Sequence, residues 1–249
     1  MLRPLVRALI VVPALNEERS VGPLIADLRA ESGKHGVEIV PVVIDDGSTD
    51  RTSQVAAAAG ARVVQLPKNL GIGGAVQTGL RLAWREGFSC AVQIDGDGQH
   101  PPPELSKLFA AFRGSPTPDL VVGTRYGDDR QGFQSTLLRR LGSGWLRWVL
   151  RVVAGVRSTD PTSGYRLYGP RALALFERAY PYDYPEPESL AMARAAGLNI
   201  AEVPVVMRAR TAGSSSIRSW RTAYYMLKVS IAVALCYARS VRRPWPKAM

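Results

Sequence analysis

The sequence has few residues that could form disulfides or bind soft metals. Its 249 residues include two cysteines, Cys90 and Cys236, and two histidines, with no CxxC pair and no Cys/His cluster. We therefore expect neither a disulfide framework nor a zinc site. Both cysteines lie in apolar runs, so we expect small core residues in a protein from a reducing compartment.

Long hydrophobic runs are also lacking. No segment supplies the roughly 20 consecutive apolar residues of a comfortable membrane span. Arg3 and Arg7 precede the apolar residues 8–15 as they would in a signal peptide, but this run is short and ends at Asn16 and Glu17. We expect a core strand at this position.

Acidic residues are missing from two long stretches of a chain whose formal net charge is +11. Residues 131–159 and 203–249 contain no Asp or Glu, and their basic residues alternate with Leu, Trp and Val. This pattern favours an anionic membrane surface as partner over nucleic acid. The helix expected over residues 220–239 is amphipathic with cationic flanks, which is typical of an interfacial helix; a core or oligomer helix is the alternative.

Strands and helices alternate along the first half of the chain. The apolar, β-branched runs predict strands at residues 5–12, 38–44, 62–66, 90–94 and 119–123, with helices between them. This alternation indicates an α/β fold, a doubly wound and mostly parallel sheet with helices on both faces. After Tyr126 the alternation stops, and we expect a helix at 135–153, a short strand within 160–168 and a further strand at 200–207.

Ligands of such sheets bind beyond the carboxyl ends of the strands. Three of the four expected strand ends carry carboxylates, and the fourth carries Arg125. An acidic edge on a basic chain is unusual for a plain solvated surface, and we expect these side chains to converge.

The segment QIDGDGQH, residues 93–100, follows the expected strand at 90–94. Asp95 and Asp97 are spaced so that both can reach one hard cation, and Mg²⁺ is usually held by one or two carboxylates together with substrate phosphates. Gly96 and Gly98 allow the backbone to approach a ligand closely. The alternative is a solvated Asp-Gly turn between strand and helix. His100, beside three prolines, is a poor candidate for a general base, and we expect it to pack or to be exposed.

Other polar residues near the strand ends have two interpretations each. Asp45 and Asp46 could contact a metal, a base or a ribose, because Ser48, Thr49 and Asp50 are available to cap the next helix. Arg125 could bind a phosphate or pair with Asp95 or Asp128, and Arg166 is similarly ambiguous.

Two further motifs are less specific. The GIGG sequence within residues 69–74 is not the dinucleotide fingerprint, although it opens a helix on which a phosphate could dock. Glu186 and Glu188 alternate with prolines in a segment expected to be a stiff loop, where either could serve as a base.

The motifs together resemble a known family. They are, in order, IVVPALNEE, VIDDGSTDRT, NLGIGGAVQTGL, VQIDGDGQHPPPEL, VVGTRYG, DPTSGYRLYG and AEVPVVMRAR followed by AGSSSI. This ordered set, covering roughly residues 5–235, is similar to inverting glycosyltransferases of family 2, most of all to dolichyl- or polyprenyl-phosphate hexosyltransferases of mannosyl or glucosyl type. The resemblance implies a GT-A fold, a nucleotide-sugar donor (a UDP- or GDP-hexose) and Mg²⁺ or Mn²⁺.

The resemblance also implies roles for individual residues. Those expected to line the nucleotide sugar are Pro13, Ala14, Asn16, Glu17, Asp45, Asp46, Asp95, Arg139 and Arg140. Asp95 and Asp97 match the D-x-D element, and with Gln99 they are the expected metal ligands. Arg125, with Arg139 or Arg140, is expected to meet a diphosphate or an acceptor phosphate. Glu188 falls where relatives with hydroxyl acceptors place a base.

These expectations combine into one hypothesis: transfer of a hexose with inversion to a polyprenyl phosphate. A lipid phosphate is already ionised and needs no strong base, and a metal and an arginine would stabilise the leaving diphosphate. The alternatives are a hydroxyl acceptor with Glu188 as base, and a non-catalytic nucleotide or nucleic-acid binder. We expect residues 1–215 to form the catalytic domain, residues 216–249 an amphipathic segment, and the protein to be cytoplasmic and peripheral at the inner face of the membrane.

Overall fold

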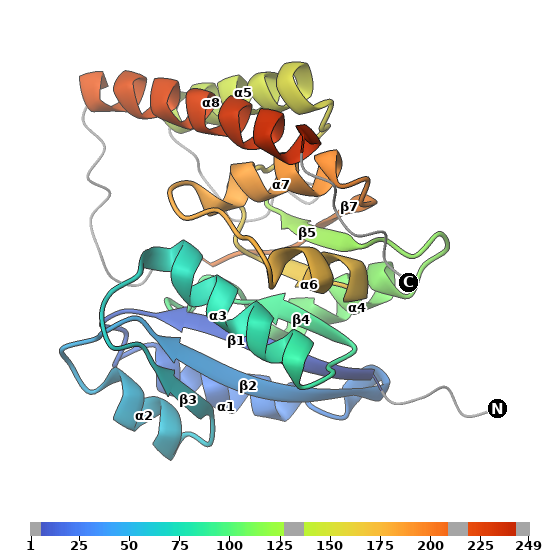
Figure 1. Ribbon diagram of the computed structural model, residues 1–249. Coiled ribbons are helices and arrows are strands. Elements are labelled where there is room, and N and C mark those ends of the chain that lie inside the picture. The colour runs from blue at the N-terminus through green and yellow to red at the C-terminus, as the bar shows by residue number, and fades with distance from the viewer. Residues whose placement is uncertain (1–5, 127–136, 209–218, 243–249) are drawn as a thin grey trace.

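The computed structural model describes residues 6–126, 137–208 and 219–242, with the side chains of residues 35, 137–141 and 219–225 outside the description. Its centre is a seven-stranded sheet in the order β3-β2-β1-β4-β6-β5-β7 (Figure 1). The strands are β1 (Val6–Ala14), β2 (Val37–Asp45), β3 (Arg62–Gln65), β4 (Cys90–Gln93), β5 (Leu120–Thr124), β6 (Arg166–Tyr168) and β7 (Ile200–Pro204). The expected mixed, mostly parallel α/β sheet is confirmed.

One short strand interrupts the parallel order. β6 runs antiparallel to both β4 and β5, pairing Val92 with Leu167 and Val121 with Leu167. The segment that precedes β6 is therefore delivered to the edge where β4 and β5 end. The sequence predicted a short strand here but gave no sign of its place between β4 and β5.

Helices cover both faces of the sheet, as predicted. The helices are α1 (Val21–Glu31), α2 (Thr52–Ala58), α3 (Gly71–Arg85), α4 (Leu105–Phe112), α5 (Leu137–Ala154), α6 (Pro170–Phe176), α7 (Pro185–Ala195) and α8 (Ser219–Arg242), with short 3-10 turns at Lys34–Gly36 and Pro102–Glu104. Alternate residues of β1 point to opposite faces: Ala8 and Ile10 pack with α1 and α4, whereas Leu9 and Val11 pack with α3 and α6. All four are fully buried, which explains the unbroken apolar run of this strand.

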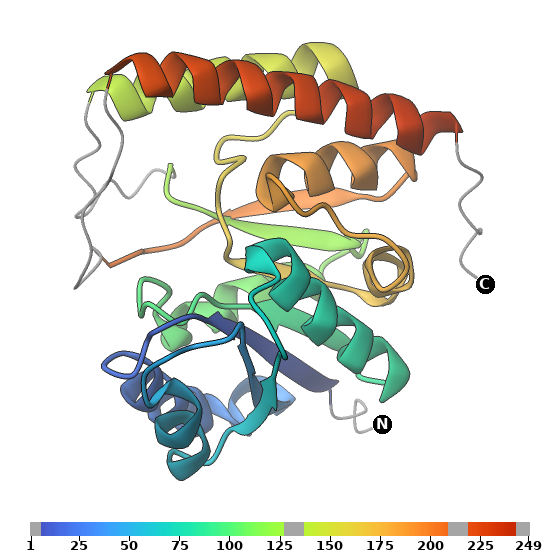
Figure 2. The ribbon, with the colours of Figure 1, turned by 60° about the vertical axis from the view of Figure 1, so that its left-hand side comes forward.

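The helices α5 and α8 lie side by side as an outer layer beyond α7 (Figure 2). Val229 and Val233 of α8 are buried in the same core cluster as Leu190 of α7. The predicted boundary between residues 215 and 216 falls outside the described residues, so the two-part division remains a prediction.

The segment with alternating prolines is a helix rather than the expected loop. Helix α7 begins at Pro185, so Glu186 and Glu188 lie in its first turn. Proline is tolerated there because the first N–H groups of a helix have no partner within the helix. Acidic side chains in that turn are also favoured by the helix dipole. The loop assignment was therefore wrong for these two residues.

Candidate functional site

The ends of β1, β2 and β4 meet at one edge of the sheet. The N–H of Asp46 donates to the carbonyl of Ala14 at 2.9 Å, and the N–H of Gly96 donates to the carbonyl of Pro13 at 3.2 Å. A Cβ on Gly96 would come within 3.0 Å of that carbonyl, so glycine is required for this close approach. The structure thus brings together the strand ends that the sequence predicted to converge.

Asn16 and Glu17 connect the end of β1 to the turn after β2. Asn16 has a positive φ of 57°, and its N–H donates to Ser48 Oγ at 2.9 Å. The Oδ1 of Asn16 accepts the N–H of Thr49 at 2.9 Å, and the N–H of Glu17 donates to Thr52 Oγ1 at 2.8 Å. These bonds fix the shape of the acidic edge; a role of both residues in nucleotide binding remains a prediction.

Asp45 and Asp46 are buried and hydrogen-bonded within the protein. Asp45 accepts the N–H of Ser48 at 2.8 Å and the hydroxyl of Ser53, and Asp46 accepts the N–H of Leu70 at 2.6 Å. Asp45 therefore takes part in organising this turn, together with Ser48. Each carboxylate fixes a loop at the edge, and contact with a nucleotide remains a prediction for both.

The turn after β4 holds Asp95, Asp97, Gln99 and His100. The carboxylate of Asp97 accepts the N–H of Gln99 at 3.0 Å and its side-chain amide at 2.7 Å. The N–H of Asp95 donates to Nδ1 of His100 at 3.1 Å, and that imidazole stacks on Tyr165. Burial lowers the pKa of His100, in keeping with an Nδ1 that accepts. His100 thus packs against Tyr165 and accepts a hydrogen bond from the turn, in agreement with the expectation that it packs.

The donor set at this turn suits a hard cation that takes further ligands from a phosphate. Asp95, Asp97 and the amide oxygen of Gln99 are all oxygen donors, as Mg²⁺ and Mn²⁺ prefer. Within the described part of the chain, no group of three or more His, Cys, Asp and Glu side chains could hold a metal. The residues therefore fit an ion shared with a ligand, and they do not form a complete protein cage.

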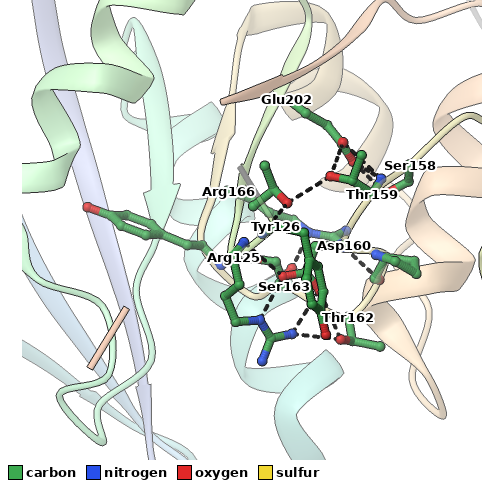
Figure 3. A network of polar contacts seen from close by, with 12 residues as sticks. Arg125, Tyr126, Ser158, Thr159, Asp160, Thr162, Ser163, Arg166 and Glu202 are labelled. Atoms are coloured by element: carbon green, nitrogen blue, oxygen red, sulfur yellow. Dashed lines mark hydrogen bonds and ion pairs between the residues drawn. The ribbon is translucent and has the colours of Figure 1, made fainter. Parts of the chain in front are cut away.

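Arg125 follows β5 and is held by an acid that sequence reasoning did not identify. Its Nε and Nη2 donate to the two carboxylate oxygens of Asp160 at 2.7 and 2.8 Å, and Nη2 also donates to Thr162 at 2.8 Å (Figure 3). Burial acts to lower the pKa of Arg125, but the hydrogen bonds and charge of Asp160 raise it, so the guanidinium stays charged. The structure corrects the expected partner from Asp95 to Asp160, while Asp128 lies outside the described residues.

The charge of Arg125 interacts with the acidic turn. Asp95 is among the groups that raise the pKa of Arg125, and both residues act on the pKa of His100. A cationic side chain therefore lies near the carboxylates of the turn. Arg139 and Arg140 belong to α5, but their side chains are outside the described residues, so their contact with phosphate remains a prediction.

Arg166 is a structural residue of this region. It is fully buried and donates to the carbonyl of Ser163 at 2.7 Å, to Ser189 Oγ at 2.6 Å and to the carbonyl of Pro161 at 3.3 Å. These bonds join the segment before β6 to α7. The two interpretations offered for Arg166 were a phosphate ligand and a partner of an acid, whereas its described hydrogen bonds go to two carbonyls and a hydroxyl.

Glu186 and Glu188 occupy different surroundings. The carboxylate of Glu188 accepts the N–H of Tyr184 at 2.9 Å and lines a cavity of about 670 Å³ between α7 and α8, together with Lys228 and Arg239. Burial raises the pKa of Glu186, which interacts with the charges of Arg166 and Asp95. The charge of Asp95 thus acts on the pKa of Glu186, and the role of Glu188 as a base for a hydroxyl acceptor remains a prediction. Helical spacing was the missed signal, because residues two apart on a helix point in different directions.

Carboxylates and a charged arginine beyond the carboxyl ends of the strands lie where sheets of this kind bind their ligands. The sequence profile described as glycosyl transferase family 2 matches residues 9–172. The chain belongs to this family and is a glycosyltransferase, as the motifs predicted.

Individual proteins agree with this assignment. The chain is 30% identical over 244 residues to a polyprenol monophosphomannose synthase of Mycolicibacterium smegmatis, covering 92% of this chain and 87% of the relative. It is 28% identical over 216 residues to a UDP-N-acetylglucosamine–dolichyl-phosphate N-acetylglucosaminyltransferase of Methanococcus voltae, covering 79% and 83%. A solved structure of glucosyl-3-phosphoglycerate synthase from Mycobacterium tuberculosis, in complex with Mn²⁺, UDP and phosphoglyceric acid, has a TM-score of 0.68 at 22% identity, covering 96% and 79%. This likeness confirms the GT-A fold.

Proposed function

We propose that this glycosyltransferase moves a hexose, with inversion, from a nucleoside diphosphate sugar to a polyprenyl phosphate, using Mg²⁺ or Mn²⁺. The observation that carries the donor half is the turn of Asp95 and Asp97 beside the end of β1, with Arg125 near it. The acceptor half is supported by the two relatives, whose names share a polyprenyl- or dolichyl-linked phosphate and differ in the sugar. UDP and GDP are therefore both candidate nucleotides.

The residues of the site divide the chemistry between them. A divalent ion held by Asp95, Asp97 and Gln99 would stabilise the negative charge of the leaving diphosphate. Arg125, kept charged and oriented by Asp160, faces an anionic oxygen of donor or acceptor. A lipid phosphate attacks as an anion, so this proposal assigns no residue the task of removing a proton.

A donor screen tests the proposal. Purified protein is mixed with a polyprenyl phosphate in detergent, with Mg²⁺ or Mn²⁺, and with UDP-glucose, UDP-N-acetylglucosamine or GDP-mannose in turn. We expect release of nucleoside diphosphate and a lipid-linked sugar of inverted anomeric configuration with one of these donors. Hydrolysis without lipid product, or inactivity with every donor in the screen, would contradict it.

A hydroxyl acceptor is the second candidate, favoured by one observation: burial raises the pKa of both Glu186 and Glu188, as is typical of a carboxylate that serves as a base. A hydroxyl must lose its proton on attack, and a positioned base contributes about 10²- to 10⁴-fold to such a step. For a lipid phosphate acceptor, we expect Glu186→Gln to keep turnover within a few-fold of wild type.

Glu188→Gln changes the other glutamate of the same helix turn, the expected base for a hydroxyl acceptor, and it should also keep turnover near wild type with a lipid phosphate. Steady-state rates of both variants over pH 5–9, with lipid phosphate and with sugar hydroxyl acceptors, separate the two candidates. A loss of about 10²-fold or more in either variant would transfer the proposal to the hydroxyl acceptor.

We also propose that the outer layer of α5 and α8 contacts an anionic membrane surface on the cytoplasmic side. In this proposal residues 1–215 form the catalytic part of the chain, and residues 216–249 contribute to the membrane contact. On α8, Leu227, Ile231 and Leu235 form an exposed apolar stripe, and on α5 Trp148 and Val152 are more than half exposed. Among the described side chains of these two helices, the exposed cations are Arg147, Arg151, Lys228, Arg239 and Arg242. No helix among the described residues is long and apolar enough to cross a membrane.

Sedimentation with vesicles tests this surface. We expect binding to vesicles containing phosphatidylglycerol, weaker binding to phosphatidylcholine alone, and release by salt. Replacing Trp148 and Leu235 together with serine should weaken binding about tenfold or more, because apolar area enters the interface. Trp84→Ser, which changes an exposed tryptophan of α3, is the control. Equal binding of all three proteins would refute the assignment of this surface.

A further inference from the structure

A network of polar side chains links β7 to Arg125 (Figure 3). It starts at Glu202 of β7, whose carboxylate accepts the hydroxyl of Ser158 at 2.5 Å and the hydroxyl of Thr159 at 2.6 Å. The same carboxylate accepts the N–H of Thr159 at 2.9 and 3.0 Å. Glu202 therefore fixes both the backbone and the side chain of Thr159.

Thr159 connects Glu202 to both members of the ion pair between Arg125 and Asp160. In sequence it precedes Asp160, which holds Arg125. In space its hydroxyl hydrogen-bonds that of Thr124 at 2.7 Å, and Thr124 precedes Arg125. Thr159, which precedes Asp160, therefore binds the carboxylate of Glu202 directly, and Thr124, which precedes Arg125, is linked to it through Thr159.

The ion pair with Asp160 fixes the orientation of the Arg125 guanidinium. Asp160 is fully buried, accepts two side-chain N–H groups of Arg125 and also accepts its backbone N–H at 3.2 Å. A two-point bond between planar groups leaves the guanidinium little freedom to rotate. Its orientation therefore depends on where the backbone of residues 159–160 is held.

The network requires a carboxylate at residue 202. All the hydrogen bonds described for Glu202 are accepted ones, coming from two hydroxyls and one N–H. An amide in its place would present an NH₂ group to donors, so glutamine can satisfy only part of the set.

We propose that Glu202 is a positioning residue, which acts through Thr159 and Asp160 to aim the Arg125 guanidinium at the phosphate group of a substrate. The choice of a phosphate as the target rests on the proposed function, whereas the orientation of Arg125 by Glu202 does not depend on it. Supporting residues of this kind typically change activity by about 10- to 100-fold when they are replaced.

The first experiment needs no substrate. In ¹⁵N-labelled protein, the Nε–H resonance of Arg125, assigned by its loss in Arg125→Lys, should be sharp and slow to exchange with solvent, because it donates to buried Asp160. Glu202→Gln should broaden it or speed its exchange at least tenfold. Glu38→Gln, which breaks the exposed pair between Arg7 and Glu38 on β2, is the matched control and should leave it unchanged. An unchanged resonance in Glu202→Gln would overturn the proposal.

The second experiment is a double-mutant cycle with the active donor. Glu202→Gln should lower kcat/KM about 10- to 100-fold. In that background Arg125→Ala should cost far less than it costs in wild type, because the guanidinium is already misdirected. Independent, multiplying losses would assign Glu202 a structural role only and overturn the proposal.

A second variant and a measurement that is independent of turnover separate the role of Glu202 from misfolding and from failure of the proposed function. If Glu202→Gln unfolds at the assay temperature, Thr159→Val replaces it, since valine keeps the shape of threonine and removes the hydroxyl that joins Glu202 to Thr124. If wild type transfers no sugar from any donor, the proposed function fails while the Nε–H measurement still decides the role of Glu202.

Discussion

Asp97→Ala is expected to lower turnover by about 10²- to 10³-fold, the loss that follows removal of one group stabilising charge in a transition state. Asp97 lies in the turn after β4, where its carboxylate hydrogen-bonds Gln99 two residues away. These bonds belong to the turn and not to the core, so the variant should fold with little change in melting temperature. The loss should appear as weaker metal-dependent nucleotide binding together with lower kcat.

Two measurements check this result. Release of nucleoside diphosphate reports turnover, and calorimetry with UDP or GDP, with and without Mn²⁺, reports nucleotide binding. Asp27→Ala removes an exposed carboxylate from α1 and serves as the control, which should match wild type in both assays. If Asp97→Ala keeps nucleotide binding that depends on the metal, then Asp97 is not a ligand of the ion.

The meeting of the strand ends could be predicted because it follows from topology. Parallel neighbouring strands end at the same edge, and an unbroken apolar run such as that of β1 marks a strand buried on both faces. Pro13 and Ala14 therefore had to lie beside whatever followed β2 and β4. The hydrogen bonds from Asp46 and Gly96 to these two residues have this origin.

The partner of Arg125 could not be predicted in the same way. Asp160 is 35 residues away, and it reaches Arg125 because antiparallel β6 inserts between β4 and β5. A three-residue strand gives too short a pattern to reveal its place in a sheet. Glu202 was missed for the same reason, since its donors lie in the segment that leads to β6.

The assignment of the two glutamates failed at the level of local structure. Alternating prolines indicated a loop, yet Pro185 and Pro187 occupy the first turn of α7, where a missing N–H costs nothing. Once that turn is helical, Glu186 and Glu188 diverge, one toward the charges of Arg166 and Asp95 and the other into the cavity beside α8. The direction of each side chain thus depended on the helix, which the sequence pattern did not predict.

Arg166→Met is expected to destabilise the fold by about 3 kcal/mol or more, because each buried acceptor left without a donor costs about 1–3 kcal/mol. The Arg166 side chain is fully enclosed, and its three bonds leave Ser189 and the carbonyls of Pro161 and Ser163 without a donor when it is lost. Urea unfolding should show a lower midpoint with little change in slope. Arg171→Met is the control, because the pair of Arg171 with Asp119 is partly exposed and should contribute at most about 1 kcal/mol.

The same substitution should also change the site, and this second effect separates charge from packing. Arg166 acts to lower the pKa of Glu186 against the effect of burial, so its removal should raise that pKa further. Arg166→Lys keeps a positive charge but cannot reach three acceptors with one ammonium group. The lysine variant should therefore lose stability as the methionine variant does, while the pKa of Glu186, followed by carbon-detected NMR, stays closer to its wild-type value. Equal shifts of that pKa in both variants would show that the geometry of Arg166, and not its charge, sets the electrostatics beside Asp95.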